Sequence, residues 1–174
     1  MLPTDPSPVL FVSYFYGLIL LVGGIAGIWL GAVVSDKLGE TDKTIYGRAP
    51  AYSFIATIPF FLIGILSNSL IIVFFSFMII QALSFVMMGP LVSSLQHIVG
   101  PNMRATTSAI ALFINNLVGI GLGNLLIGIL SDVLSAQFAE EALRYSIASG
   151  VIFYIFAAIL FLYAARNLES DWQD

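Results

Sequence analysis

The charged residues of the chain are separated by long segments in which most side chains are apolar. No Asp, Glu, Lys or Arg occurs in four gaps, those between Asp5 and Asp36, Arg48 and Arg104, Arg104 and Asp132, and Arg144 and Arg166. About 20 apolar residues are needed to cross a bilayer as a helix. The second gap is too long for one helix, and the polar triplet at 67–69 divides it. The pattern predicts five transmembrane helices, at residues 9–34, 49–66, 70–99, 105–130 and 143–165.

Continuous apolar runs favour helices over strands. Strands of a membrane barrel alternate apolar and polar residues, whereas a helix satisfies its own backbone hydrogen bonds in lipid. Composition agrees, because 59% of the 174 residues are apolar and 9% are charged, against about 45–50% and about 25% in a soluble domain. The expected fold class is an all-α integral membrane protein in the lipid bilayer. A net charge of −4 argues against a nucleic-acid partner.

The distribution of Lys and Arg predicts the topology. Five cations fall on one side of the membrane, namely Lys37, Lys43, Arg48, Arg104 and Arg166, and Arg144 falls on the other. Cytoplasmic loops are rich in Lys and Arg. We therefore expect a multi-pass protein of the cell (inner) membrane, with its N-terminus outside and its C-terminus in the cytoplasm. Residues 1–8 lack Lys and Arg, so they are expected to form a short loop rather than a signal peptide.

The first and fourth expected helices carry similar sequences. A shift of 96 positions places six residues on identical ones: Gly23, Gly27, Leu30, Ser35, Asp36 and Leu38 fall on Gly119, Gly123, Leu126, Ser131, Asp132 and Leu134. Helices three spans apart run in opposite directions, so the pattern indicates an inverted repeat of three helices, which is typical of secondary transporters. In that repeat the chain provides two helices of one triplet and three of the next.

Three stretches resemble the major facilitator superfamily. One is Gly23-Gly24-x-x-Gly27-x-x-x-Gly31-x-x-x-Ser35-Asp36-Lys37-Leu38-Gly39, which is similar to the signature after the eighth helix of that family. Another is Met88-Gly89-Pro90, in what would be the tenth helix. The last is Pro101-Asn102-Met103-Arg104-Ala105-Thr106 followed by Asn115-Asn116-x-x-Gly119-x-Gly121-x-Gly123, which resembles bacterial members of the spinster-like branch.

The resemblance implies a partial C-terminal half-bundle, the last five of twelve helices. It implies a secondary active carrier that works by alternating access on a small organic or amphiphilic, lipid-like solute. The implied partner is a missing N-terminal half, or an oligomer partner in its place, and the chain would be a truncated C-terminal fragment. The alternative is a five-helix membrane protein or partial gene product with no transport activity of its own. The sequence departs from the family pattern at Ala32, at Glu40 and at Asn124.

Two groups of residues are candidates for conformational roles. In the family, the acid equivalent to Asp36 is a gating contact. The resemblance also implies gating or conformational roles for Gly31, Lys37, Gly39 and Arg104. The alternative is that Asp36 is a solvated cap while Lys37 reaches the headgroups. Glycines spaced by four lie on one helix face and allow close packing, so the glycines of both repeats are interpreted either as packing surfaces or as sliding surfaces.

Polar residues in the middle of a span are the candidates for contact with solute. Amides are costly in hydrocarbon unless they are paired or face a cavity. Asn115 and Asn116 are therefore expected either to line a solute cavity or to form interhelical hydrogen bonds, and packing is favoured for Asn115 because it lies on the glycine face. Gln81 and Ser84 lie near Met87 and Met88, whose flexible side chains suit an apolar pocket. The alternative for these four is ordinary packing.

The expected spans contain no acid, Lys or Arg. An intramembrane enzyme would need a nucleophile with a base, or metal ligands, at membrane depth, and the chain has no cysteine and one histidine, His97, near a helix end. We therefore expect no catalytic residue, no metal site and no cofactor. Pro59 and Gly89-Pro90 are expected to kink their helices, and Arg144 is expected to lie within reach of Glu140 or Glu141.

Overall fold

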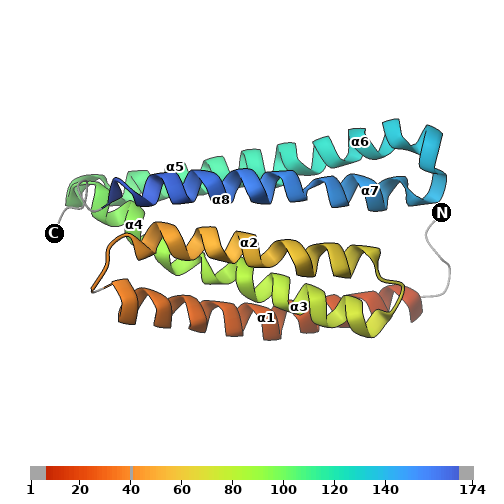
Figure 1. Cartoon of the computed structure of the whole chain (residues 1–174), viewed down its shortest axis with the longest axis horizontal. Coiled ribbons are helices and arrows are strands. Elements are labelled where there is room, and N and C mark those ends of the chain that lie inside the picture. The colour runs from red at the N-terminus through yellow and green to blue at the C-terminus, as the bar shows by residue number, and fades with distance from the viewer. Residues whose placement is uncertain (1–6, 40, 169–174) are drawn as a thin grey trace.

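Every regular element in the computed structural model, which describes residues 7–39 and 41–168, is a helix (Figure 1). Five helical segments are long and apolar enough to cross a membrane, so the expected fold class is confirmed. The elements are α1 (Ser7–Gly39), α2 (Ile45–Leu66), α3 (Leu70–Val86), α4 (Met88–Ile98), η1 (Pro101–Met103), α5 (Arg104–Ile114), η2 (Asn115–Leu122), α6 (Gly123–Phe138), η3 (Ala139–Glu141), α7 (Ala142–Ser149) and α8 (Val151–Ala165).

Four of the five helical spans extend beyond the expected apolar limits, and the third, Leu70–Ile98, does not. The first begins at Ser7, so the end of the expected loop at residues 1–8 is helical, and residues 1–6 lie outside the described part. The fourth span runs without a loop from Pro101 to Phe138. A helix continues into the membrane–water interface as long as its backbone hydrogen bonds can form. The length of an apolar segment in the sequence therefore underestimates the length of the helix.

The third span breaks at Met87, between α3 and α4, where a kink at Gly89-Pro90 was expected. Pro90 has no backbone N–H and leaves the carbonyl of Val86 without its helical donor. In contrast, α2 continues unbroken through Pro50 and Pro59. The fifth span is divided at Gly150 into α7 and α8.

The middle of the fourth span is a π-helix, η2, where an ordinary α-helix was expected. Asn116 donates from Nδ2 to the carbonyl of Leu112 at 2.7 Å, and such side-chain bonds compete with the α-helical ladder. Glycines at 119 and 121 reduce helix propensity over the same turns. The spacing of apolar residues along the sequence does not predict this change from α-helix to π-helix.

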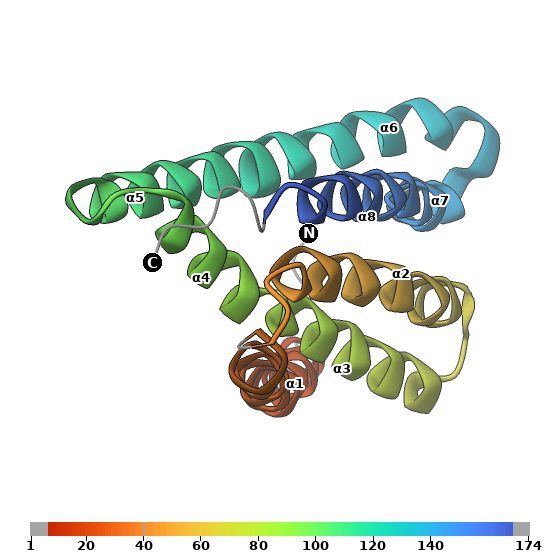
Figure 2. The ribbon, with the colours of Figure 1, turned by 60° about the vertical axis from the view of Figure 1, so that its left-hand side comes forward.

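The helix α2 lies at the centre of the bundle (Figure 2). It packs against α3 on one side and α8 on the other, and α1 packs along α3. The fourth span, α5–η2–α6, lies at the edge beyond α7 and α8 and has no buried residue in its apolar window. It contacts α4 at one end and α7 at the other.

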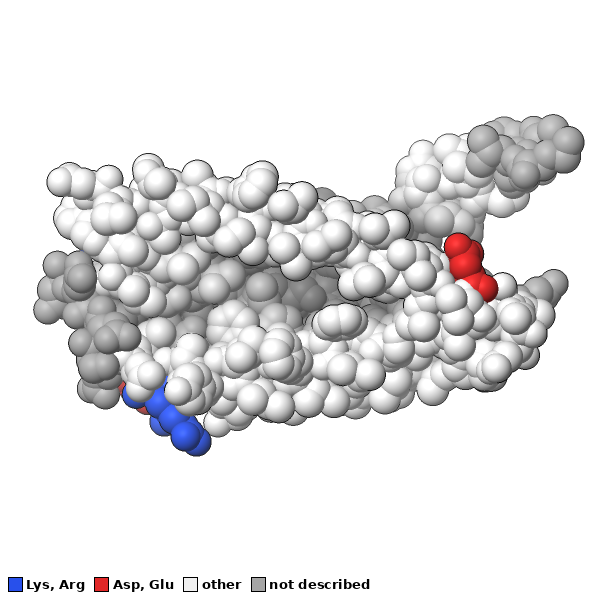
Figure 3. Space-filling view, turned by 90° about the horizontal axis from the view of Figure 1, so that it is seen from above, with Lys and Arg blue, Asp and Glu red and all other residues white. Residues whose placement is uncertain are grey.

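Figure 3 shows that the charged side chains visible on one face lie toward its ends, with uncharged surface between them. The turn at 41–44 and the start of α5 lie at one end of the bundle, and the α2–α3 turn lies at the opposite end with η3 (Figure 1). Lys37, Lys43, Arg48 and Arg104 therefore share an end, which we call the basic end. Arg144 lies at the opposite end.

Candidate functional site

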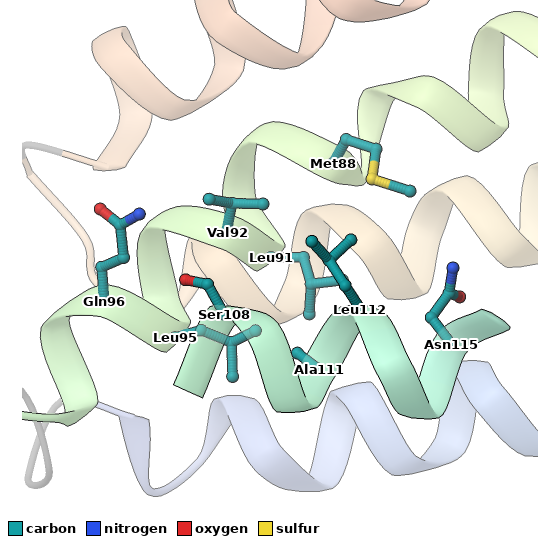
Figure 4. Close-up of a pocket in the computed structure, with 9 residues that line it drawn as sticks. All are labelled: Met88, Leu91, Val92, Leu95, Gln96, Ser108, Ala111, Leu112 and Asn115. Atoms are coloured by element: carbon teal, nitrogen blue, oxygen red, sulfur yellow. The ribbon is translucent and has the colours of Figure 1, made fainter. Parts of the chain in front are cut away.

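A cavity of about 270 Å³ lies between α4 and α5, close to the basic end (Figure 4). Its walls are apolar for most of their length, and polar side chains occur at intervals along it. The lining residues are Met88, Leu91, Val92, Leu95, Gln96, Ser108, Ala111, Leu112 and Asn115. An apolar groove with a few separated polar groups is the usual form of a small-molecule site.

Two of the six expected cavity residues, Met88 and Asn115, line this cavity. Asn115 was placed with the glycine face from its spacing, and the structure puts its amide at the end of the cavity remote from Gln96 (Figure 4). Gln96 and Ser108 were not singled out from the sequence. Both lie within a few turns of the bend at Gly100, where two consecutive helices must face each other, and this proximity is the signal that could have identified them.

The other four expected cavity residues do not line this cavity. Gln81 lies at the contact between α3 and α1, where its Cβ is close to Gly23. Ser84 donates to the carbonyl of Ile80 in its own helix at 2.9 Å. Met87 forms the junction between α3 and α4, and the amide of Asn116 is bonded within its own helix.

The glycines of α1 form its packing surface against α3 and α4. A Cβ atom added at Gly23, Gly27 or Gly31 would lie 2.7, 2.2 or 2.6 Å from a carbonyl oxygen of the facing helix. Those oxygens belong to Met78, Ala82 and Val86, which are themselves spaced by four residues. The glycines of this row are therefore in close packing contact with the facing helix in this structure.

Gly39 has a similar role at the basic end. A Cβ atom there would lie 2.4 Å from Oη of Tyr46, and the hydroxyl of Tyr46 donates to the carbonyl of Ser35 at 3.4 Å. This contact closes the last turn of α1 onto the start of α2. Asp36 and Lys37 lie on the exposed side of the same turn, and their side chains make no hydrogen bond or ion pair with another described residue.

Arg104 begins α5 at the basic end and is partly buried. Its Nε is inaccessible and has no hydrogen-bond partner among the described residues. The hydroxyl of Ser35 is buried without a partner in the same way, at the contact of α1 with Gly89. Neither atom is connected to the cavity by a hydrogen bond.

The glycines of the fourth span have no packing partner on another helix of the described part of the chain. A Cβ atom at Gly119 or Gly123 would meet only atoms of its own helix, at 3.7 and 3.8 Å. Both glycines line a second hollow, of about 560 Å³, between the fourth and fifth spans. Its other walls come from α7, α8 and Phe61 of α2.

At the end opposite the basic end, Arg144 links α7 to the turn after α2. Its guanidinium donates to the carbonyls of Ile65 and Ser67 and to Oδ1 of Asn68. The expected ion pair is present with Glu141, at 3.9 Å, while the side chain of Glu140 lies outside the described part. The backbone partners were not predicted, because nothing local in the sequence relates residues 65 and 144.

No family model matches the chain. It is 28% identical over 167 residues to protein spinster homolog 3 of Danio rerio, an alignment that covers 91% of this chain and 34% of the relative. The chain therefore spans about a third of that relative.

Solved structures share the fold. The inward-facing, unoccupied crystal structure of a bacterial homolog to the human lysosomal transporter Spinster matches with a TM-score of 0.77 and 24% identity, over 89% of this chain and 40% of that one. The inward-facing, occupied form matches with a TM-score of 0.72 and 22% identity, over 88% and 40%. The chain is thus similar in sequence to a spinster homolog, and it has part of the fold of a bacterial homolog to the lysosomal transporter Spinster.

Proposed function

We propose that this chain is the C-terminal five-helix part of a secondary transporter of the major facilitator type, carrying a small organic or lipid-like solute by alternating access. The observation that carries the proposal is the match of 89% of the chain to a solved spinster-type transporter at a TM-score of 0.77. The similarity to a spinster homolog along 91% of the chain supports it from sequence. An intramembrane enzyme has no comparable support.

The cavity between α4 and α5 is the proposed contact for the solute. Its apolar wall suits a hydrocarbon tail, and the amides of Gln96 and Asn115 at separate positions suit polar groups of an amphiphile. Amide and hydroxyl groups in such a wall fix the orientation of a ligand. Met88 contributes a flexible side chain that can adapt to solutes of different shape.

The proposed transporter needs helices beyond these five. The cavity is lined by two helical segments of one chain, and the chain covers 40% of the solved transporter. A carrier with alternating access moves two bundles about a site between them, so the remaining wall would come from a complementary part. The second candidate is a five-helix protein without transport activity, in which lipid would cover the exposed fourth span.

Reconstitution in liposomes tests the proposal. The chain is co-purified with the part of the bacterial spinster homologue that it does not cover, and uptake of a fluorescent single-chain amphiphile is measured. We expect saturable uptake by the pair and none by the chain alone. Asn115→Leu should remove uptake, whereas Asn116→Leu, on the neighbouring position but bonded within its own helix, should retain it. Equal effects of the two substitutions would contradict the assigned cavity.

A further inference from the structure

The hydroxyl of Ser35 differs from other hydroxyl groups in the long helices. Ser13, Thr57 and Ser84 each donate to a carbonyl oxygen four residues earlier in their own helix, at 2.8, 2.8 and 2.9 Å. Ser35 is 8% exposed, and its Oγ has no hydrogen-bond partner among the described residues. Oγ lies toward α4, 3.2 Å from the position of a Cβ atom added at Gly89. A buried hydroxyl without an acceptor destabilises a structure, so an acceptor is to be sought around it.

A carbonyl oxygen without its helical donor lies at the same contact. Pro90 has no backbone N–H, so the carbonyl of Val86 lacks the donor that an α-helix would provide four residues later. That oxygen is 2.6 Å from the position of a Cβ atom added at Gly31. Gly31 precedes Ser35 by one helical turn on the same face of α1. The hydroxyl and the carbonyl therefore face the same junction, and no hydrogen bond joins them.

The third span is interrupted at this junction. The helix α3 ends at Val86 and α4 begins at Met88, and a break of this kind at proline can absorb a change of backbone angles. The helix α4 packs against α1, α2 and α5. It also forms one wall of the cavity described above (Figure 4), through Met88, Leu91, Val92, Leu95 and Gln96. A turn of α4 about the junction would therefore change the width of that cavity.

We propose that the junction of α3 and α4 is a hinge with two positions, and that Ser35 stabilises the second of them. In this structure Gly89 packs against Ser35 and the hydrogen bond is absent. When α4 turns away from α1, Oγ of Ser35 donates to the carbonyl of Val86, and one bond satisfies both groups. A solute that fits one width of the cavity selects one position. The hinge and its hydrogen bond do not depend on transport, which enters only through that solute.

NMR of the Val86 carbonyl tests the hydrogen bond directly. Val86 and Met87 form the sole Val-Met pair of the sequence, so carbonyl-13C valine with 15N methionine gives a single carbonyl–amide correlation. Hydrogen bonding moves a carbonyl 13C signal downfield. For the purified chain in lipid nanodiscs, we expect the mean shift to lie downfield of that in Ser35→Ala. This variant should fold, because it removes a hydroxyl that has no partner. Identical shifts would overturn the proposal.

Two further variants separate the bond from a general disturbance. Pro90→Ala returns a backbone N–H to the Val86 carbonyl, so Ser35→Ala should have no effect on the signal in that background. Ser94→Ala is the matched control, because Ser94 is a buried serine of α4 whose hydroxyl donates to the carbonyl of Leu91 at 2.9 Å. It should leave the signal unchanged. An equal effect of Ser35→Ala with and without Pro90, or an equal effect of Ser94→Ala, would contradict the proposed bond.

Distances between spin labels test whether α4 moves. The chain has no cysteine, so labels can be attached through Tyr52→Cys on α2 and Ile98→Cys at the end of α4, which are 59% and 36% exposed. We expect two distances in the otherwise unchanged chain and one after Ser35→Ala. A single distance in both would overturn the hinge. Two distances in a chain that gives no uptake with its complementary part would retain the hinge and overturn transport.

Discussion

Arg144 donates a hydrogen bond from Nε to the carbonyl oxygen of Ile65, which lies 79 positions earlier in the chain. This carbonyl belongs to the last turn of α2, where backbone oxygens have no partner within the helix. The same guanidinium reaches the carbonyl of Ser67 at 3.2 Å. A cation at a helix C-terminus is also favoured by the helix dipole. Arg144 therefore joins the two triplets at the end opposite the basic end.

Arg144→Ala should destabilise the bundle, because it leaves carbonyls of α2 without a donor. Loss of a partly buried charged donor costs about 1–3 kcal/mol, which thermal unfolding in detergent would detect by circular dichroism. Arg144→Lys should recover only part of this stability, because an ammonium group lacks the planar fork of donors.

Glu141→Gln is the control for the ion pair of Arg144. The pair measures 3.9 Å and Glu141 is 57% exposed, so its loss should change stability by less than about 1 kcal/mol. A loss for Glu141→Gln as large as for Arg144→Ala would show that the ion pair, not the contact with α2, stabilises this end.

Gly27→Ala should weaken the packing of α1 on α3. The added Cβ would lie 2.2 Å from the carbonyl oxygen of Ala82, so the two backbones must separate, at a cost of about 1–3 kcal/mol. Gly17→Ala is the matched control in the same helix, with no atom within 4 Å of its Cβ. There, alanine should be neutral or stabilise the helix by up to about 1 kcal/mol. Equal unfolding temperatures for the two variants would contradict the packing role.

The two glycine rows show how much of the helix packing can be predicted from the sequence. Their spacing by four predicted helix faces of small residues, and the structure confirms close packing for Gly23, Gly27 and Gly31. At Gly119 and Gly123, which have the same spacing, an added Cβ atom would meet only atoms of its own helix among the described residues. A packing face can be predicted from its own residues, but its partner depends on tertiary arrangement.

Asn115 and Asn116 show a second limit. Both are amides in the middle of a span, and the sequence favoured packing for Asn115 because it lies on the glycine face. In the structure Asn115 lines the cavity while Asn116 bonds to the carbonyl of Leu112. The π-helical winding that begins at Asn115 changes the direction in which each successive side chain points, and periodicity at 3.6 residues per turn does not anticipate it.

The turn between α1 and α2 carries a carboxyl group whose titration can be followed. The hydroxyl of Thr44 donates to Oδ1 of Asp42 at 2.6 Å and its backbone N–H at 2.8 Å, and these bonds, with a smaller contribution from Arg48, hold the pKa of Asp42 below 3.8. A lowered pKa in the folded state means that the carboxylate stabilises the turn above pH 3.8, and that this contribution is lost as the pH falls through the lowered pKa.

Thr44→Ala should therefore raise the pKa of Asp42 more than Arg48→Gln does, because the threonine hydroxyl has the larger effect. Carbon-13 NMR titration of the Asp42 carboxyl in detergent measures both variants. A larger rise for Arg48→Gln would show that charge, rather than hydrogen bonding, determines the pKa at this position.

The topology can be tested with single cysteines, because the chain contains none. The basic end is expected to face the cytoplasm, since Lys and Arg are retained on that side of the membrane. Thr41→Cys, in the turn at that end, should not react with an impermeant maleimide in intact cells and should react after permeabilisation. Asn68→Cys, in the turn beside Arg144, should react in both. Reaction of Thr41→Cys in intact cells, with protection of Asn68→Cys, would invert the topology and place the basic end outside.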